Sequence, residues 1–263
     1  MHAHAFDQYQ AQNSRIHRLD PRVKLLIAVG YILSNALLPD GSWAAFALAW
    51  LALLVATDLS QLGLAFTLKR SVVALPFALV AVSAIFSPVG EPLAEWDLGF
   101  VTLAPTDVGV IRFFSILVRS WLSVQMAILL VATTQFPDLI HAFEHLRVPR
   151  SLTTIIAFLY RYLFVLVDEV YRMLRARDAR SAGLPGQKHG GKLLWRVKVT
   201  GSMAGQLFLR SYERSERIYN AMVSRGYTGH FRTLNPHDLN RRDWQVLILA
   251  LVLIAMIQVT GRL

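Results

Sequence analysis

Two arginines stand directly before the predicted ends of two long helices, where a cationic side chain has a use. Arg180 precedes a helix stop at Gly183, and Arg225 precedes one at Gly226. Glycine just past a periodic segment is typical of a helix C-terminus. A guanidinium there complements the negative end of the helix dipole. Its planar fork can equally enter a partner's acidic groove and bind a carboxylate, and the residue pattern leaves both explanations open.

A second pattern suggests metal chemistry. Residues 141–145 (HAFEH) have the H-x-x-E-H spacing of inverted zinc peptidases, in which two histidines share a helix face and the glutamate acts as a base. Glu169 is a nearby downstream acid that could supply a third ligand. A membrane-embedded zinc metalloenzyme using His141, Glu144 and His145 is therefore one alternative function.

Residues 186–192 (GQKHGGK) match most of a phosphate-binding loop. However, Leu193 stands where Ser or Thr should bind magnesium, and no apolar strand precedes the loop. The segment is therefore predicted to be a flexible connector between two helices. No cofactor is expected in this chain.

The composition places these residues in a membrane protein. The chain has 263 residues, of which 54% are hydrophobic and 17% charged, with a mean hydropathy of +0.42. Soluble domains carry about a quarter charged residues, so these values argue against a soluble enzyme and exclude disorder. Cysteine is absent, which excludes disulfides, thiolate metal sites and a cysteine nucleophile.

Five apolar runs are predicted to span the bilayer, at 23–38, 43–57, 71–87, 108–134 and 244–260. The first two are short and separated by a turn at Pro39, which predicts a helical hairpin. Pro76 predicts a kink in the third run, and Arg119 is expected to face protein or to snorkel. A cleavable signal peptide is the rival for the first run, but the polar segment ahead of it is long for a signal.

Loop charges predict the orientation. Basic residues before the first run and at Lys69-Arg70 indicate cytosolic segments, whereas the acidic loop 88–107 lacks Lys and Arg and is predicted to be external. The formal net charge of +10 is concentrated in 147–232, a segment that contains 16 Lys and Arg but only five Asp and Glu. This block is predicted to be cytosolic. The apolar run 152–167 inside it is predicted to pack at the inner boundary without spanning.

The later part of the basic block has helical periodicity. Apolar or small residues recur every three or four positions on one face, while arginines occupy another. Upstream, Gly201 and Gly205 are four residues apart, which would let a second helix backbone approach closely. The striped positions are Phe208, Tyr212, Ser215, Tyr219, Met222 and Gly226.

Several segments resemble a known membrane-protein family. Residues 17–26 (HRLDPRVKLL), 134–139 (TQFPDL) and 146–149 (LRVP) are similar to segments of the transmembrane T component of energy-coupling-factor (ECF) transporters, in its cobalt-type version, the CbiQ family. This family marks two coupling helices with Ala-Arg-Gly signatures. Residues 221–227 (AMVSRGY) resemble the second signature and 176–181 (ARDARS) the first, with one serine substituted in each.

The apolar runs and loop charges predict an all-α integral membrane protein with about five transmembrane helices and a cytosolic helical domain inserted before the last span. The resemblance implies that this domain is a coupling domain. The implied domains are 1–134, with the N-terminal segment and four spans, 135–243, with the coupling helices, and 244–263, with the last span. Arg180 and Arg225 would contact the ATPases, with Arg177 as the alternative to Arg180. Gly201, Gly205 and Gly226 would serve helix packing and termination.

The implied function is non-catalytic. A T subunit would couple a pair of ABC-type ATPases, which bind ATP and magnesium, to a cobalt-type substrate-capturing membrane S subunit. The chain would lie in a bacterial inner membrane as a multi-pass protein with a cytosolic N-terminus. Its partners would be these subunits and the lipid bilayer, with no nucleic acid. Besides the zinc enzyme, a membrane-anchored basic binding protein is the remaining alternative, and its binding would weaken steeply with salt.

Overall fold

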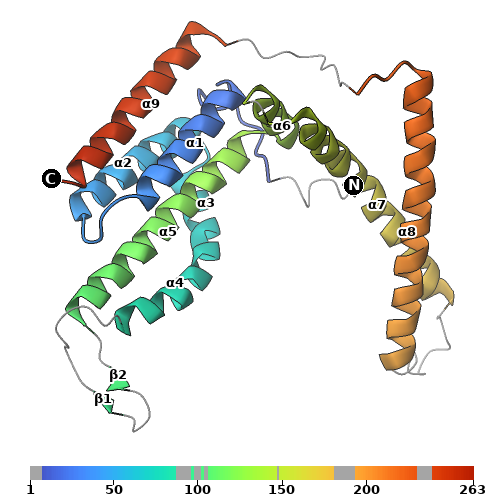
Figure 1. The fold of residues 1–263 in the computed structure, drawn as a ribbon, viewed down its shortest axis with the longest axis horizontal. Helices are drawn as coiled ribbons and strands as arrows, with labels where there is room; N and C mark the ends of the chain where they lie inside the picture. The colour runs from blue at the N-terminus through green and yellow to red at the C-terminus, as the bar shows by residue number, and fades with distance from the viewer. Residues whose placement is uncertain are drawn as a thin grey trace. The chain divides into compact units, whose positions relative to one another are not determined.

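The computed structural model describes residues 8–86, 96–97, 102–103, 106–146, 148–180, 193–229 and 239–263. Contacts within the chain define two units (Figure 1). The bundle unit comprises Phe6–Leu146 and Asn235–Leu263, and the two-helix unit lies within Arg147–Leu234. Each unit is described by itself below.

Helices dominate both units, as the predicted fold class requires. The two-helix unit contains α7 (Arg150–Arg180) and α8 (Leu193–Ser224). Strands β1 and β2 pair antiparallel in the bundle unit, with two residues each. The bundle unit further contains α1 (Pro21–Ala36), α2 (Trp43–Ser60), α3 (Leu64–Arg70), the 3-10 segment η2 (Ser71–Ala74), α4 (Leu75–Ala81), the 3-10 segment η3 (Val82–Phe86), β1 (Trp96–Asp97), β2 (Thr102–Leu103), α5 (Asp107–Thr133), α6 (Phe136–His145) and α9 (Arg241–Thr260).

Polar side chains cap the N-terminal ends of three bundle helices. Asp20 accepts the backbone N–H of Arg22 at α1, and Thr106 accepts the N–H of Gly109 at α5. Asn240 forms a reciprocal capping box at α9. These bonds satisfy backbone donors that a helix leaves unpaired at its start, so the sequence itself specifies where these helices begin.

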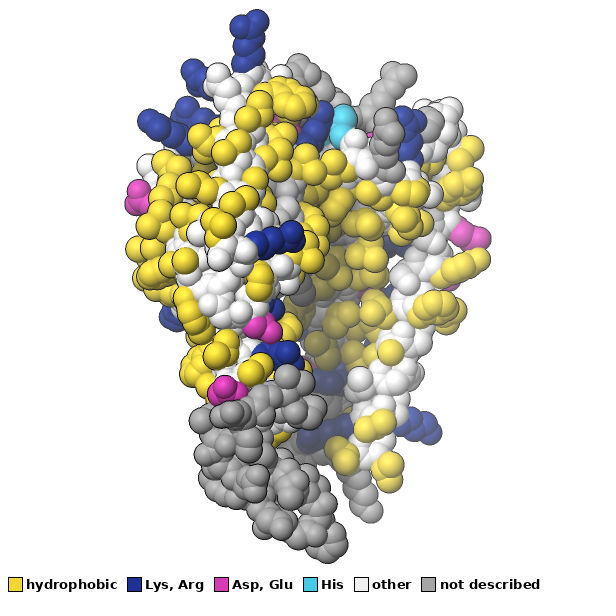
Figure 2. All heavy atoms as spheres, turned by 60° about the vertical axis from the view of Figure 1, so that its left-hand side comes forward, with side chains coloured by type: hydrophobic (Ala, Val, Ile, Leu, Met, Phe, Trp, Pro, Cys, Tyr) yellow, Lys and Arg dark blue, Asp and Glu magenta, His cyan; other side chains and the backbone are white. Residues whose placement is uncertain are grey.

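The core of the bundle unit is apolar, and so is much of its outer surface. The core joins α1, α2, α5 and α9, with Leu122 and Ala45 fully buried. Outward-facing side chains such as Leu51 and Leu249 are 59% and 71% exposed. Hydrophobic side chains also predominate on the surface in Figure 2. Lipid tails are as apolar as leucine, so such faces suit a bilayer and would be poorly solvated in water.

Among the described residues, four helices are long and apolar enough to cross a membrane, namely α2, α5, α7 and α9. Leu64–Ala74 and Leu79–Phe86 provide a fifth span if taken together, with a bend of 49° in the run where Pro76 predicts a kink. The prediction of about five spans is therefore confirmed, and the protein is a multi-pass membrane protein.

The individual spans differ in two places from the predicted set. Helix α1 has 16 residues and is about 24 Å long, shorter than the roughly 30 Å of hydrocarbon in a bilayer. Helix α7 is long and apolar enough to cross a membrane. The sequence predicts, in contrast, that 152–167 stays at the inner boundary. Basic residues at both ends and Arg161 at its centre motivate that placement, which stays a prediction.

Arg119 in α5 contacts protein, one of the two positions predicted for it. Its guanidinium donates to the Asp40 carboxylate at 2.7 Å and to the Leu38 carbonyl at 2.6 Å. Arg112 contacts the same carboxylate at 3.3 Å, and the Asn35 amide donates to the Arg119 carbonyl at 2.9 Å. The turn between α1 and α2 is thereby fastened to α5.

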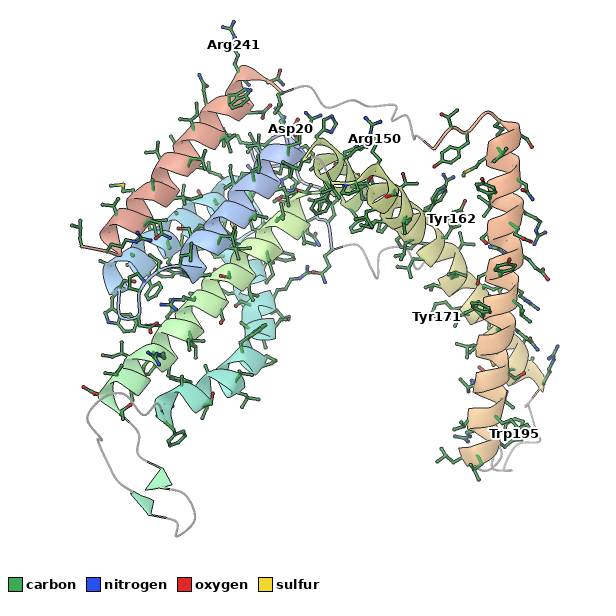
Figure 3. All side chains as sticks on the ribbon, viewed as in Figure 1. Asp20, Arg150, Tyr162, Tyr171, Trp195 and Arg241 are labelled. Carbon is green, nitrogen blue, oxygen red and sulfur yellow. The ribbon has the colours of Figure 1, made fainter. Side chains whose placement is uncertain are left out.

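A buried polar cluster joins the starts of α1 and α9 to the end of α5. Lys24 is 8% exposed, and its Nζ donates to the carbonyls of His17 at 3.1 Å and Thr133 at 3.0 Å. The carboxylates of Asp138, Asp20 and Asp243 attract its charge, and Asp20 and Asp243 are 4% and 5% exposed. The Asp20 N–H also donates to Oδ1 of Asp243 at 3.3 Å. Asp20 is labelled at the start of α1 in Figure 3.

Candidate functional site: the crossed helices α7 and α8

Helices α7 and α8 are the longest in the described chain, with 31 and 32 residues, or about 47 Å each. Residues from the first half of α7 face residues from the second half of α8, so the helices run in opposite directions. Thr153 and Glu169 are the buried residues of α7, and none of the 32 described residues of α8 is buried. A hydrophobic core therefore does not hold this pair together.

A carboxylate lies at the crossing instead. Glu169 of α7 is 8% exposed and pairs with Arg172 on its own helix. From α8, Arg210 donates to Oε1 at 2.5 Å, and Arg214 lies 3.8 Å from Oε2. The hydrogen bonds from Arg210 and then Arg172 lower the pKa of Glu169 below its usual range, because they favour the ionised form. Glu169 is thus a carboxylate shared by guanidiniums of both helices.

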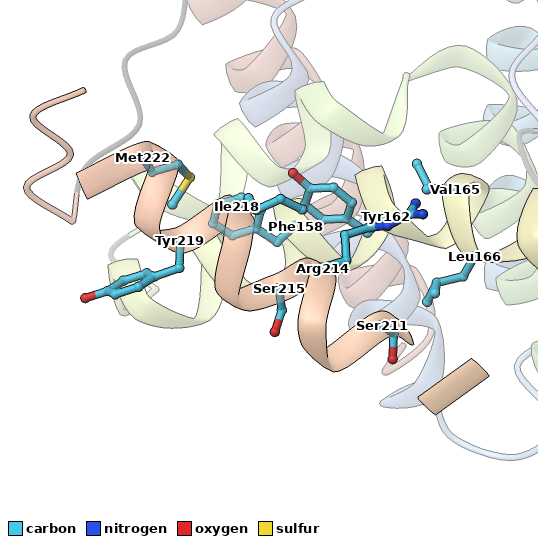
Figure 4. Close-up of a pocket in the computed structure, with 10 residues that line it drawn as sticks. All are labelled: Phe158, Tyr162, Val165, Leu166, Ser211, Arg214, Ser215, Ile218, Tyr219 and Met222. Atoms are coloured by element: carbon cyan, nitrogen blue, oxygen red, sulfur yellow. The ribbon is translucent and has the colours of Figure 1, made fainter. Parts of the chain in front are cut away.

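An apolar groove of about 340 Å³ lies beside this crossing (Figure 4). Side chains on α8 outside the groove are also apolar and exposed, among them Phe208 at 69% and Tyr212 at 57%. An exposed apolar surface of this kind marks a binding surface for protein or membrane. The groove is lined by Phe158, Tyr162, Val165, Leu166, Ser211, Arg214, Ser215, Ile218, Tyr219 and Met222.

The first predicted contact arginine lies at the end of α7. Arg180 is the last residue of this helix and its side chain is exposed. Arg177, the alternative, lies one turn earlier and pairs with Asp178 at 2.9 Å. Arg177 therefore has a local partner, and the choice of Arg180 as the first contact arginine stays a prediction. Gly183 and the phosphate-loop match at 186–192 lie outside the described residues.

The second predicted contact arginine lies at the end of α8. Arg225 follows the last helical residue, Ser224, and is exposed. Gly226 has φ +80°, a conformation that glycine adopts without strain. Its N–H donates to the Val223 carbonyl, and the N–H of Tyr227 donates to the Met222 carbonyl. This is the Schellman arrangement, which fixes the direction in which the chain leaves the helix.

Gly201 and Gly205 lie in the first half of α8 on exposed positions. Among the described residues, nothing lies within 4 Å of a Cβ built at either glycine. The close helix approach that their spacing predicts is therefore not formed within the described chain. Their packing role stays a prediction that concerns a partner.

The proposed zinc residues His141, Glu144 and His145 lie in the second half of α6. Nε2 of His145 accepts a hydrogen bond from Arg22 at 2.8 Å, and Nδ1 donates to the His141 carbonyl at 3.0 Å. Both ring nitrogens are thus engaged, one of them by a cation that would repel a metal ion. Within the described residues, no three or more His, Asp or Glu side chains are grouped as metal ligands. This geometry does not favour the zinc alternative.

Sequence reasoning missed the role of Glu169, which it considered only as a third zinc ligand. One signal was available, since Glu169 and Arg172 are spaced for a pair on one helix face. The contacts with Arg210 and Arg214 depend on how two helices cross and carry no local signature.

Together, the apolar helices and the basic pair of crossed helices define a membrane protein with a helical unit suited to contact other proteins. A model of the family described as "Cobalt transport protein", CbiQ, matches residues 12–236. The chain therefore belongs to the CbiQ family, which confirms the resemblance inferred from its motifs.

Several proteins resemble the chain over most of its length. It is 29% identical over 252 residues to the energy-coupling factor transporter transmembrane protein EcfT of Lacticaseibacillus paracasei, covering 90% of both chains. It is 28% identical over 265 residues to the EcfT protein of Brevibacillus brevis, covering 96% of both. An uncharacterised protein of Methanocaldococcus jannaschii is 26% identical over 266 residues, covering 98% of this chain and 86% of its own.

Proposed function

We propose that this chain is the transmembrane T subunit of an ECF-type ABC importer. It would transmit the ATP-driven motion of two ATPase subunits to a substrate-capturing membrane S subunit. One observation carries the proposal: α7 and α8 cross at a shared carboxylate, and each ends beside an exposed arginine, Arg180 and Arg225. The names of the EcfT relatives support it.

The two arginines would anchor the helix ends in acidic grooves of the ATPases. A charge-assisted, bidentate Arg–carboxylate bond is strong and directional, so it transmits displacement of the groove to the helix. The Schellman turn at Gly226 supports this role, since it holds the chain after Arg225 away from the helix axis. ATP and magnesium would be bound by the ATPases, and the chain itself would be non-catalytic.

The apolar groove between α7 and α8 is the surface that we assign to the S subunit. The α7 side of the groove lies in the apolar run 152–167, which is predicted to pack at the inner boundary of the membrane. An apolar segment of the S subunit at that boundary would cover side chains that are now exposed. Ile218→Asp would place a charge there. We expect this variant to lose the co-purified S subunit while it retains the ATPases.

The orientation and the substrate complete the proposal. Basic residues in the N-terminal segment and in 147–232 support a cytosolic N-terminus and a cytosolic two-helix unit in a bacterial inner membrane. The family description supports cobalt as the transported ion. The S subunit would select it.

Capture of ATPases by the detergent-solubilised protein tests the proposal. Candidate ABC ATPases from the same organism are mixed with wild type, Arg180→Glu, Arg225→Glu and the control Arg217→Glu, an exposed arginine within α8. Wild type and control are expected to hold an ATPase pair. Each end variant should lower capture about 30-fold or more, since loss of a buried charge pair costs about 2 kcal/mol or more.

Two results would contradict the proposal. Wild type that captures no ATPase would remove the coupling function. End variants that bind as well as wild type, while folded, would make the arginines simple complements of the helix dipole.

A further inference from the structure

We propose that Glu169 is a positioning residue that fixes the angle at which α7 and α8 cross. Its consequence for coupling rests on the proposed function. The carboxylate is more buried than any other residue of the described pair except Thr153, which lies near the start of α7. It therefore occupies the place that an apolar side chain fills in most helix crossings.

The contacts of Glu169 restrain both helices at one point. Arg172 on α7 takes Oε2, and Arg210 on α8 takes Oε1 at 2.5 Å. Arg214, one turn after Arg210, lies 3.8 Å from Oε2. A carboxylate bound from two directions by planar guanidiniums permits few relative orientations of the helices. An apolar contact alone is non-directional and would permit many.

The crossing lies far from the two helix ends, so a small change in the crossing angle moves those ends by several ångströms. Glu169 and Arg180 are 11 residues apart on α7, and Arg225 follows Arg214 by 11 residues and Arg210 by 15 residues on α8. At 1.5 Å per residue, Arg180 lies about 16 Å from the crossing along its helix and Arg225 lies about 16–23 Å from it. A change of crossing angle therefore displaces both proposed ATPase contacts by similar distances. One carboxylate thus sets the spacing that two ATPases must match.

Charge balance predicts what happens without the carboxylate. Three guanidiniums converge on Glu169 in the described structure, so Glu169→Gln leaves them without a counter-charge. Their mutual repulsion would then widen the crossing. Helix crossings of one packing class scatter by about 15–20°, and such a rotation moves the end of a 16 Å arm by about 5 Å.

Distance measurements between spin labels test this inference on the full chain. The protein has no cysteine, so Ala179→Cys on α7 and Ser202→Cys on α8 give one label on each helix, both on the same side of the crossing. In this background, Glu169→Gln should shift the mean label distance by about 5 Å or broaden its distribution comparably. Glu169→Asp keeps the charge and should stay within the wild-type width. Asp168→Asn is the matched control, because it removes the same charge from the adjacent, exposed position.

A distribution for Glu169→Gln that coincides with wild type would overturn the inference, as would an equal shift in Asp168→Asn. Helical content and elution as a single species establish that each variant is folded. If Glu169→Gln does not fold, Arg210→Gln breaks one cross-helix ion pair and leaves Glu169 paired with Arg172. It should shift the distance in the same direction by a smaller amount.

Capture of the ATPases by the unlabelled variants separates this inference from the proposed function. Glu169→Gln retains Arg180 and Arg225, yet should capture the ATPase pair at least tenfold less well, and Glu169→Asp should restore capture. Wild type without ATPase capture would overturn the proposed function, while the label distances still decide the role of Glu169. Normal capture with unchanged distances in Glu169→Gln would overturn the role of Glu169 alone.

Discussion

Lys24→Met is expected to lower the free energy of unfolding by about 2–4 kcal/mol, because it removes a charged donor from two buried carbonyl contacts. Methionine matches the length of lysine but brings no charge. Asp20 and Asp243, at 4% and 5% exposure, would lose the cation that attracts them. The carbonyls of His17 and Thr133 would each lose a donor. Reversible unfolding in mixed micelles, followed by the fluorescence of the six tryptophans, measures the change.

Lys69→Met is the matched control, since Lys69 is exposed and its replacement should alter stability by less than about 0.5 kcal/mol. A second variant tests the cause. Asp20→Asn keeps a capping residue at α1 but removes one buried charge, so Lys24→Met should be less damaging in that background. Equal losses in both backgrounds would show that the cluster is not held by charge.

Gly109→Ala is expected to destabilise the bundle unit by about 1–3 kcal/mol through overpacking. A Cβ at this position would lie 2.3 Å from the Ile85 carbonyl oxygen and 2.9 Å from that of Ala84, both in η3. It would also lie 2.8 Å from Oγ1 of Thr106, which caps α5. Backbone cannot move aside as a side chain can, so η3 would have to leave α5. The same unfolding measurement detects the change.

Gly201→Ala, the same substitution at an exposed position, is expected to keep or raise the stability. Its Cβ would meet no described atom within 4 Å, and alanine favours a helix over glycine by up to about 1 kcal/mol. Gly109→Ala as stable as Gly201→Ala would mean that η3 does not pack closely on α5.

The membrane architecture was predictable because its signals are local. Apolar runs and loop charges follow from neighbouring residues, and the number of about five spans is confirmed. Pro39 and Gly41 stand in the turn between α1 and α2, where Gly41 has φ +80°. The extent of α7 was less accessible, because no glycine or proline marks a boundary between its apolar first half and its arginine-rich second half.

The candidate site was predictable only where a single helix specifies it. Gly226 follows the end of α8, so the neighbourhood of Arg225 has a local signature, whereas its contact with an ATPase stays a prediction. Glu169 had to wait for the structure, because its partner Arg210 is 41 residues away. Lys24 and Asp243 are even further apart in the sequence, and the pattern of polar residues along the chain does not show which buried charges lie near one another.

None of the 32 described residues of helix α8 is buried. This exposure affects how long a copy of the subunit persists in the cell without its partners. A helix with exposed apolar side chains and little packing opens easily, and open segments are what proteases cleave. An orphan copy would present this surface to chaperones and quality-control proteases until its partners cover it. The amount of the partner subunits would then determine how much of this subunit survives. Its level would match theirs through assembly, without a dedicated regulator.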